Sequence, residues 1–288
     1  MTDGSSGHAG GFTIRGVRVP GWLYGTAWKE EATESLVYGA LTTGFRGLDT
    51  ANQRKHYDEA AVGRGLAHAR QAGIHRDQLF LQTKFTHLAG QDHRLPYDAA
   101  APVGEQVAQS FASSLAHLGV THLDSLVLHG PSLRDQLAPA DREAWRAIEA
   151  IADAGGAALI GISNVTADQL RALIELARIP PALVQNRCYA QRGWDRAVRA
   201  VCRDHGIIYQ AFSLLTANRD VVAHRAIRAI ATRHACTPAQ IIFRFARQVG
   251  MLPLTGTRRL EHMRDDLAID EFALTEDEIA VIEAAGER

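Results

Sequence analysis

The chain has 288 residues, a formal net charge of -1 and an ordinary composition for a globular protein. The near-zero charge excludes nucleic acid and an anionic membrane surface as expected partners, and no apolar run approaches the ~20 residues of a membrane span. The cysteines Cys188, Cys202 and Cys236 are odd in number and widely spaced. That pattern argues against a disulfide framework, so we expect a cytoplasmic protein.

The first eleven residues, MTDGSSGHAGG, carry no basic segment followed by an apolar one, so they do not predict a secretory signal. We expect residues 1–11 to form a flexible tail and residues 12–288 to form a single domain. From Phe12 to Trp22, apolar and polar residues alternate around Gly16, which predicts a small β-hairpin ahead of the main fold.

From Leu23 onward, short apolar strands alternate with amphipathic helices, without a break in composition. Eight such units in this length predict a (β/α)₈ TIM barrel. A doubly wound sheet is the structural rival, but the chain contains no GxGxxG motif of the kind that marks a Rossmann fold. The expected strands are Leu23–Trp28, Phe45–Asp49, Leu79–Lys84, Leu123–His129, Ala158–Ser163, Leu183–Asn186, Ile207–Phe212 and Met251–Leu254. The expected helices are Glu30–Thr42, Asp58–Arg70, Val103–Leu118, Asp141–Ala154, Ala167–Leu176, Trp194–His205, Val221–His234, Pro238–Val249 and Glu276–Ala285.

Polar residues end three successive strands, and in a (β/α)₈ barrel those ends form the active site. Asp49, Lys84 and His129 occupy these positions. A lysine that follows the segment LFLQT has little room to reach water, and a buried charge without a partner is costly. We therefore expect an Asp49–Lys84 ion pair at the barrel mouth.

A tyrosine in the loop after Asp49 would complete a site for carbonyl chemistry. A lysine ammonium beside the phenol of Tyr57 would lower its pKa, so that it could donate a proton at neutral pH. His129 could hydrogen-bond to a carbonyl oxygen and orient it. This set predicts protonation of a carbonyl oxygen while another group delivers hydride.

These residues and their order resemble the aldo-keto reductase family. The matching motifs are GFRxLDTA with a following VG, QTK, LVLHxP, IGISN, LVQN and LTGTRRLEH, which extend over nearly the whole chain. The resemblance implies a (β/α)₈ barrel that binds NADPH and an Asp/Tyr/Lys/His tetrad in which Asp49, Lys84 and His129 match three members. It also implies cofactor contacts from Gly25, Thr26, Ser163, Asn164, Gln185, Phe212, Ser213, Leu215, Thr255, Gly256, Thr257, Arg258 and Arg259.

The tyrosine position departs from the family pattern, in which the tyrosine follows the aspartate by five residues. Here Arg54 stands at that place. Counting back from Val62 puts His56 in the tyrosine's position, whereas Tyr57 fits if the loop has been lengthened and one residue lost before Glu59. We prefer Tyr57, because a neutral imidazole beside a lysine ammonium is a poor proton donor. Packing of Tyr57 at a helix start is the alternative.

The residues expected to bind the 2′-phosphate of the cofactor also depart from the family pattern. The family often has Lys-Ser after the last strand, and here Leu254 and Thr255 occupy those places. Arg258 and Arg259 supply cations nearby, just before a helix expected to begin at Leu260, and arginine forks bind phosphate in a bidentate way. These residues favour NADPH, although a solvated helix start would also explain them.

The sequence thus predicts an NADPH-dependent reductase that acts on a small aldehyde or ketone, with Tyr57 as proton donor, as a monomer or weak homo-oligomer. One alternative is a regulatory or scaffold barrel that binds NADPH with little turnover. The other is a metal-dependent hydrolase using Asp49, His56 and His129, although no His-x-His pair stands at a strand end. The expected substrate contacts are Trp28, His56, Phe85 and Tyr97.

Overall fold

The computed structural model describes residues 11–286, so most of the expected N-terminal tail lies outside the described part. Eight parallel strands form a closed barrel in the order β10-β3-β4-β5-β6-β7-β8-β9, which confirms the predicted (β/α)₈ architecture. The barrel strands are β3 (Leu23–Gly25), β4 (Gly47–Asp49), β5 (Phe80–Phe85), β6 (Leu123–Leu128), β7 (Ala157–Ser163), β8 (Leu183–Arg187), β9 (Ile208–Phe212) and β10 (Leu252–Thr255).

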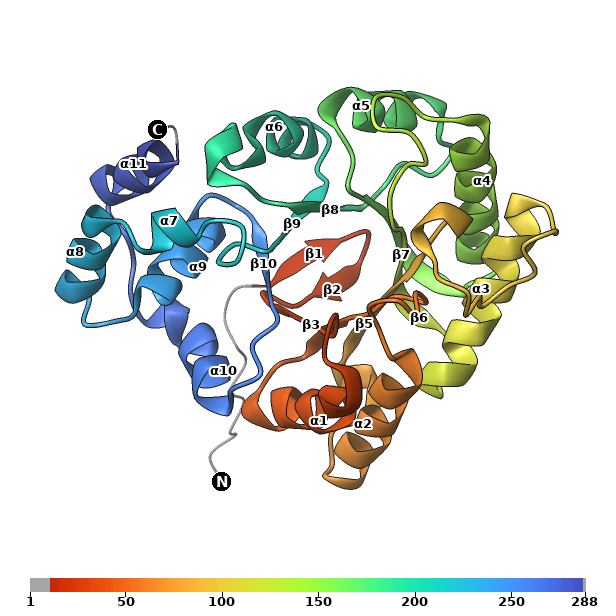
Figure 1. Ribbon diagram of the computed structural model, residues 1–288, viewed down its shortest axis with the longest axis horizontal. Coiled ribbons are helices and arrows are strands. Elements are labelled where there is room, and N and C mark those ends of the chain that lie inside the picture. Colours follow the sequence, from red (N-terminus) through yellow and green to blue (C-terminus); the bar gives the residue numbers. More distant parts are fainter. Residues whose placement is uncertain (1–10, 287–288) are drawn as a thin grey trace.

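Helices surround the barrel on its outer side (Figure 1). They are α1 (Thr33–Thr43), α2 (Glu59–Gln71), α3 (Val103–Leu118), α4 (Pro139–Asp153), α5 (Ala167–Leu176), α6 (Arg196–Asp204), α7 (Arg219–Val222), α8 (Arg225–Arg233), α9 (Pro238–Gln248), α10 (Leu260–Leu267) and α11 (Glu276–Ala285). Short 3₁₀ segments cover Glu30–Ala32, Arg76–Gln78, Leu88–Gly90, Ala190–Asp195 and Ala268–Glu271.

Side-chain caps fix several helix starts. Thr166, Thr237 and Thr275 each accept a hydrogen bond from the backbone N–H three residues later, in complete capping boxes. The predicted start of α6 at Trp194 is wrong, because residues 193–195 have left-handed backbone conformations. The buried Trp194 side chain packs against Phe245, and the helix begins only at Arg196.

The predicted N-terminal hairpin is present as β1 (Phe12–Ile14) paired antiparallel with β2 (Val17–Val19). Val19 packs in a small apolar cluster with the first residues of several barrel strands, among them Leu23, Leu183 and Leu252. The hairpin therefore covers the amino-terminal end of the barrel, and in Figure 1 it crosses the centre of the ring of strands. The hairpin does not cover the opposite end, where the strands finish, so that end is available for a functional site.

Alternation along β5 decides which side chains reach the barrel interior. Gln82 and Lys84 bond to Asp49 across the inside of the sheet, whereas the intervening Thr83 donates to Glu59 on α2. Successive strand residues point to opposite faces, so Phe85 must face the helices. It lies there in the main hydrophobic core.

Candidate active site

An ion pair between Asp49 and Lys84 forms the floor of the site, as the sequence predicts. The ammonium Nζ of Lys84 lies 2.7 Å from each carboxylate oxygen of Asp49 and donates to the carbonyl oxygen of Thr50 at 2.8 Å. Both side chains are almost completely buried, at 0% and 4% exposure. Burial lowers the pKa of Lys84, and the Asp49 carboxylate opposes that shift.

Tyr57 is the aromatic residue that the loop after β4 brings to this pair. Lys84 Nζ lies 5.3 Å from the centre of the Tyr57 ring, and the ring centres of Tyr57 and His129 are 6.0 Å apart. The loop is held by the backbone bond from Tyr57 N–H to the Gln53 carbonyl at 3.0 Å, and by Asp58, which caps α2.

The predicted lowering of the Tyr57 pKa is wrong. Burial raises the pKa of Tyr57 above its usual value, and the negative charge of Asp49 adds to the shift. Lys84 is already neutralised by Asp49, so it offers the phenol little net positive field. The phenol therefore keeps its proton at neutral pH, as a donor must before the reaction begins.

His56, the other candidate for the tyrosine's place, lies apart from the ion pair. Its ring stacks on the indole of Trp28, with ring centres 3.9 Å apart. Trp28 donates from its backbone N–H to the His56 carbonyl at 2.7 Å, so the two loops are joined at this point. The structure thus brings Tyr57 to Lys84 and His129, and brings His56 to the cavity wall.

His129 follows β6 and is fixed from both sides. Its ring Nδ1 lies 2.7 Å from the hydroxyl of Thr86, and its carbonyl accepts from the Asn164 amide at 2.8 Å. Burial, with smaller contributions from Lys84 and His56, lowers its pKa to about 3. The imidazole is neutral at neutral pH, and in the tautomer whose Nδ1 accepts from the Thr86 hydroxyl the ring proton lies on Nε2.

The low pKa of His129 predicts a pH dependence of stability. The unfolded chain takes up this proton near pH 6.5, whereas the folded protein does so only near pH 3, so stability falls as the pH falls from 6.5. Replacing His129→Gln should remove roughly 1–3 kcal/mol of the loss between pH 7 and 4.5. Urea denaturation at both pH values, with the exposed His122→Gln as control, measures it. An unchanged pH dependence in His129→Gln would contradict the expectation.

A cavity of about 900 Å³ opens above this floor. Most of the residues predicted to form the site line it. They are Gly25, Trp28, Asp49, His56, Tyr57, His129, Ser163, Asn164, Gln185, Phe212, Ser213, Leu215, Thr255, Gly256, Thr257 and Arg258. Trp28, Asn164 and Ser213 among them adopt left-handed backbone angles, with φ of 59°, 53° and 58°. Such backbone conformations cluster at functional sites.

Other predicted contacts are not part of the cavity wall. Phe85 and Tyr97 are buried in the core, with ring centres 5.7 Å apart, and the Tyr97 hydroxyl donates to the Thr86 carbonyl at 2.7 Å. Phe85 faces the helices because Lys84 faces the barrel, and Tyr97 packs on Phe85, so we retain neither as a substrate contact. Thr26 is also fully buried and donates to the Asp49 carbonyl at 3.0 Å. Arg259 is exposed and pairs with Glu261 on the surface.

Lys29 is a cavity residue that the sequence analysis missed. It is 5% exposed, lines the cavity and donates to the carbonyl of Gly256. Arg258 in turn donates to the carbonyl of Trp28, so the loops after β3 and β10 are joined in both directions. Burial, with the nearby charge of Arg258, lowers the pKa of Lys29 to about 8. The sequence did contain a signal for Lys29 as a site residue, because it is a basic residue directly after the strand end Gly-Thr-Ala-Trp.

An acidic residue with a shifted pKa was missed as well. Asp266 lines the cavity and accepts from the Thr255 hydroxyl at 2.7 Å, and burial raises its pKa to about 7. Arg187 and His262 also contribute to the wall. Arg187 is the last residue of β8, and His262 and Asp266 are on α10, whose position at the cavity local patterns do not reveal.

Among residues 11–286, no group of three or more His, Cys, Asp or Glu side chains is arranged to hold a metal ion. Nor is any helix in this range long and apolar enough to cross a membrane.

Comparisons with known proteins agree with the geometry. The profile of the aldo/keto reductase family matches residues 16–287, and the chain therefore belongs to that family. It is 29% identical to an uncharacterized oxidoreductase of Bacillus subtilis, over 94% of this chain and 91% of that protein. It is 30% identical to the D-galacturonate reductase of Fragaria ananassa, over 86% and 80% of the two chains. The crystal structure of an aldo/keto reductase from Brucella melitensis superposes with a TM-score of 0.82 at 25% identity, covering 96% of this chain and 98% of that one. The protein is thus an NAD(P)H-dependent oxidoreductase of a family that acts on small carbonyl compounds.

Proposed function

We propose that the protein reduces an aldehyde or ketone to an alcohol with NADPH, and that Tyr57 donates the proton. The observation that carries this proposal is the position of the Tyr57 ring beside both Lys84 and His129 at the floor of the cavity. NADPH, when bound, would supply the hydride that the carbonyl carbon receives. The O–H bond of Tyr57 breaks, and its proton passes to the carbonyl oxygen.

The other polar residues support this proton transfer. The Lys84 ammonium lies near the phenolate that Tyr57 becomes, and it offsets the repulsion that the Asp49 carboxylate would otherwise exert on that anion. Asp49 holds Lys84 in place through both carboxylate oxygens. Neutral His129, with its proton on Nε2, donates a hydrogen bond to the substrate oxygen and orients the carbonyl toward Tyr57.

The residues of the cavity fit a dinucleotide. At one end the amide nitrogens of Asn164 and Gln185 are engaged with protein groups, which leaves their carbonyl oxygens to accept from the NH₂ of a nicotinamide carboxamide. Phe212 offers an aromatic face in the same cavity. At the other end Lys29 and Arg258 supply the positive charge that phosphates require.

Preference for NADPH over NADH is expected to depend on Arg258. Replacing Arg258→Ala should weaken NADPH binding about tenfold and leave NADH binding within about twofold, because a charge-assisted bond to the 2′-phosphate is lost. Titration of each cofactor by fluorescence measures both affinities. Arg259→Ala is the matched control, since Arg259 lies outside the cavity wall and pairs with Glu261. Equal weakening of both cofactors would contradict a 2′-phosphate contact.

A scaffold barrel with little turnover is the rival function, and one experiment separates the two. Wild-type protein is titrated with NADPH and then assayed across a panel of aldehydes, ketones and sugar acids, which includes the substrate type named for the strawberry relative. Binding with consumption of NADPH supports the reductase. Tight binding without chemistry on any carbonyl supports the scaffold.

The compartment proposed for this reaction is the cytoplasm. Cys188, Cys202 and Cys236 are free thiols in the structure, and burial raises the pKa of each. Unpaired, protonated thiols suit a reducing compartment.

A further inference from the structure

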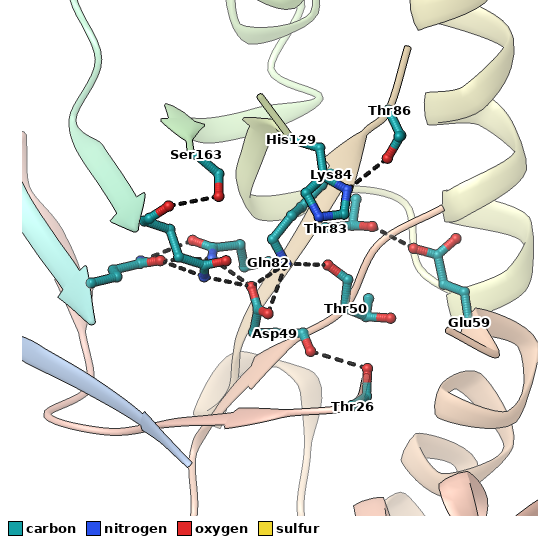
Figure 2. A network of polar contacts seen from close by, with 12 residues as sticks. Thr26, Asp49, Thr50, Glu59, Gln82, Thr83, Lys84, Thr86, His129 and Ser163 are labelled. Atoms are coloured by element: carbon teal, nitrogen blue, oxygen red, sulfur yellow. Dashed lines mark hydrogen bonds and ion pairs between the residues drawn. The ribbon is translucent and has the colours of Figure 1, made fainter. Parts of the chain in front are cut away.

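Three glutamine side chains form a polar cluster inside the barrel, directly around Asp49. They are Gln82 on β5, Gln185 on β8 and Gln210 on β9, with exposures of 1%, 4% and 0%. Figure 2 shows the network of polar contacts in which Gln82 and Asp49 take part. Burying three amides in a barrel core is costly unless every donor finds an acceptor.

Every amide hydrogen of Gln82 and Gln185 has a partner. Oδ1 of Asp49 accepts from Nε2 of Gln82 at 2.7 Å and from Nε2 of Gln185 at 2.9 Å, in addition to Lys84. Oε1 of Gln210 accepts the second hydrogen of each, at 2.8 Å and 2.9 Å. Nε2 of Gln210 donates to Oε1 of Gln82 at 2.9 Å.

The orientation of each amide follows from the carboxylate. Asp49 only accepts, so the atoms that face it must be the nitrogens of Gln82 and Gln185. Their remaining hydrogens then require an acceptor, which fixes the carbonyl oxygen of Gln210 between them. This leaves Oε1 of Gln185 without a donor among the described residues, in a side chain that lines the cavity.

We infer that Gln210 and Gln82 are positioning residues for this site. Gln210 holds Gln185 with its carbonyl oxygen toward the cavity, where it accepts from the carboxamide NH₂ of the nicotinamide. Gln82 holds Asp49 in the position from which it grips Lys84. The inference rests on the proposed function, and it concerns two residues, 128 positions apart in the sequence, that do not line the cavity.

A structural role alone predicts a different outcome, which makes the inference testable. If Gln210 only fills the barrel, its loss loosens the whole cavity and weakens every ligand alike. If it orients Gln185, its loss weakens only ligands that carry the carboxamide. A pair of ligands that differ in this group, NADP⁺ and 2′-phospho-ADP-ribose, separates the two roles.

Calorimetric titration of wild type, Gln210→Leu and Gln210→Glu with both ligands tests it. In Gln210→Leu the amide of Gln185 loses its acceptor and can turn, so NADP⁺ binding should weaken about tenfold while 2′-phospho-ADP-ribose binding stays within about twofold. Gln210→Glu keeps an acceptor oxygen at the same place and should retain the wild-type ratio of the two affinities. Ser125→Ala is the control, because Ser125 is buried on β6, which pairs with β5 and not with β9, and its hydroxyl has no hydrogen-bond partner among the described residues.

Each outcome decides the matter. A ratio that falls in Gln210→Leu and is retained in Gln210→Glu and Ser125→Ala supports the inference. If the wild-type protein binds NADP⁺ and the ratio of the two affinities is unchanged in Gln210→Leu, the inference is overturned, whereas the proposed function still stands. If wild-type protein binds neither ligand, the proposed function fails and the inference fails with it.

Discussion

Replacing Tyr57→Phe should lower kcat for carbonyl reduction about 10³-fold, within the range that a positioned proton donor contributes. The ring would keep its contacts with Lys84 and His129, and only the hydroxyl would be lost. NADPH binding should stay within about twofold of wild type, because the phenol is not expected to hold the cofactor. Steady-state kinetics on the best carbonyl of the panel, with cofactor titration beside it, measures both.

His56→Phe is the matched comparison for that variant. Its ring stacks on Trp28 at the cavity wall, 3.9 Å between ring centres, so an aromatic replacement should change kcat less than about tenfold. The reverse order, with His56→Phe inactive and Tyr57→Phe active, would assign proton transfer to His56. Full activity in both variants would remove the proton donor from this loop altogether.

Replacing Lys84→Met should lower the free energy of unfolding by about 3–5 kcal/mol and abolish activity. The ammonium and the carboxylate of Asp49 are almost completely buried, at 0% and 4% exposure, so removing one partner leaves the other charge without its counterion. Urea denaturation at pH 7, with the midpoint and slope both fitted, gives the loss.

A double variant shows whether the stability loss comes from the stranded charge. Asp49→Asn combined with Lys84→Met removes both charges, so it should recover part of the stability without restoring activity. Ser125→Ala, another buried polar change on a barrel strand, should cost no more than about 1 kcal/mol. If Lys84→Met is as stable as Ser125→Ala, the pair does not support the fold.

Much of the fold followed from local pattern. Apolar strands alternating with amphipathic helices indicate a parallel α/β fold, because each strand must bury both faces and each helix only one, and eight such units favour the closed barrel. Capping boxes at Thr166, Thr237 and Thr275 begin three of the helices, and each depends on only a few neighbouring residues. The same barrel rule brought Asp49, Lys84 and His129 to one end, since parallel strands finish together.

Alternation along a strand could also have excluded Phe85 as a substrate contact. Once Lys84 is placed inside the barrel, its neighbour must face the helices. Tyr97, which packs on Phe85, follows it into the core. No comparable sequence rule predicts the left-handed residues before α6, which make that helix begin after Trp194. Their backbone conformation depends on the packing of the Trp194 side chain against Phe245, a residue distant in sequence.

The barrel, the family resemblance and the polar strand ends can be predicted from the amino-acid sequence, because they depend on periodicity and order along the chain. Three contacts become visible only in the folded protein: the Tyr57 ring beside Lys84, Lys29 at the Gly256 carbonyl, and the amide of Gln82 against that of Gln210. A loop of unusual length can adopt several backbone paths, and the path that it takes depends on packing against residues distant in sequence. Contacts across the barrel join strands far apart in sequence, so no local pattern records them.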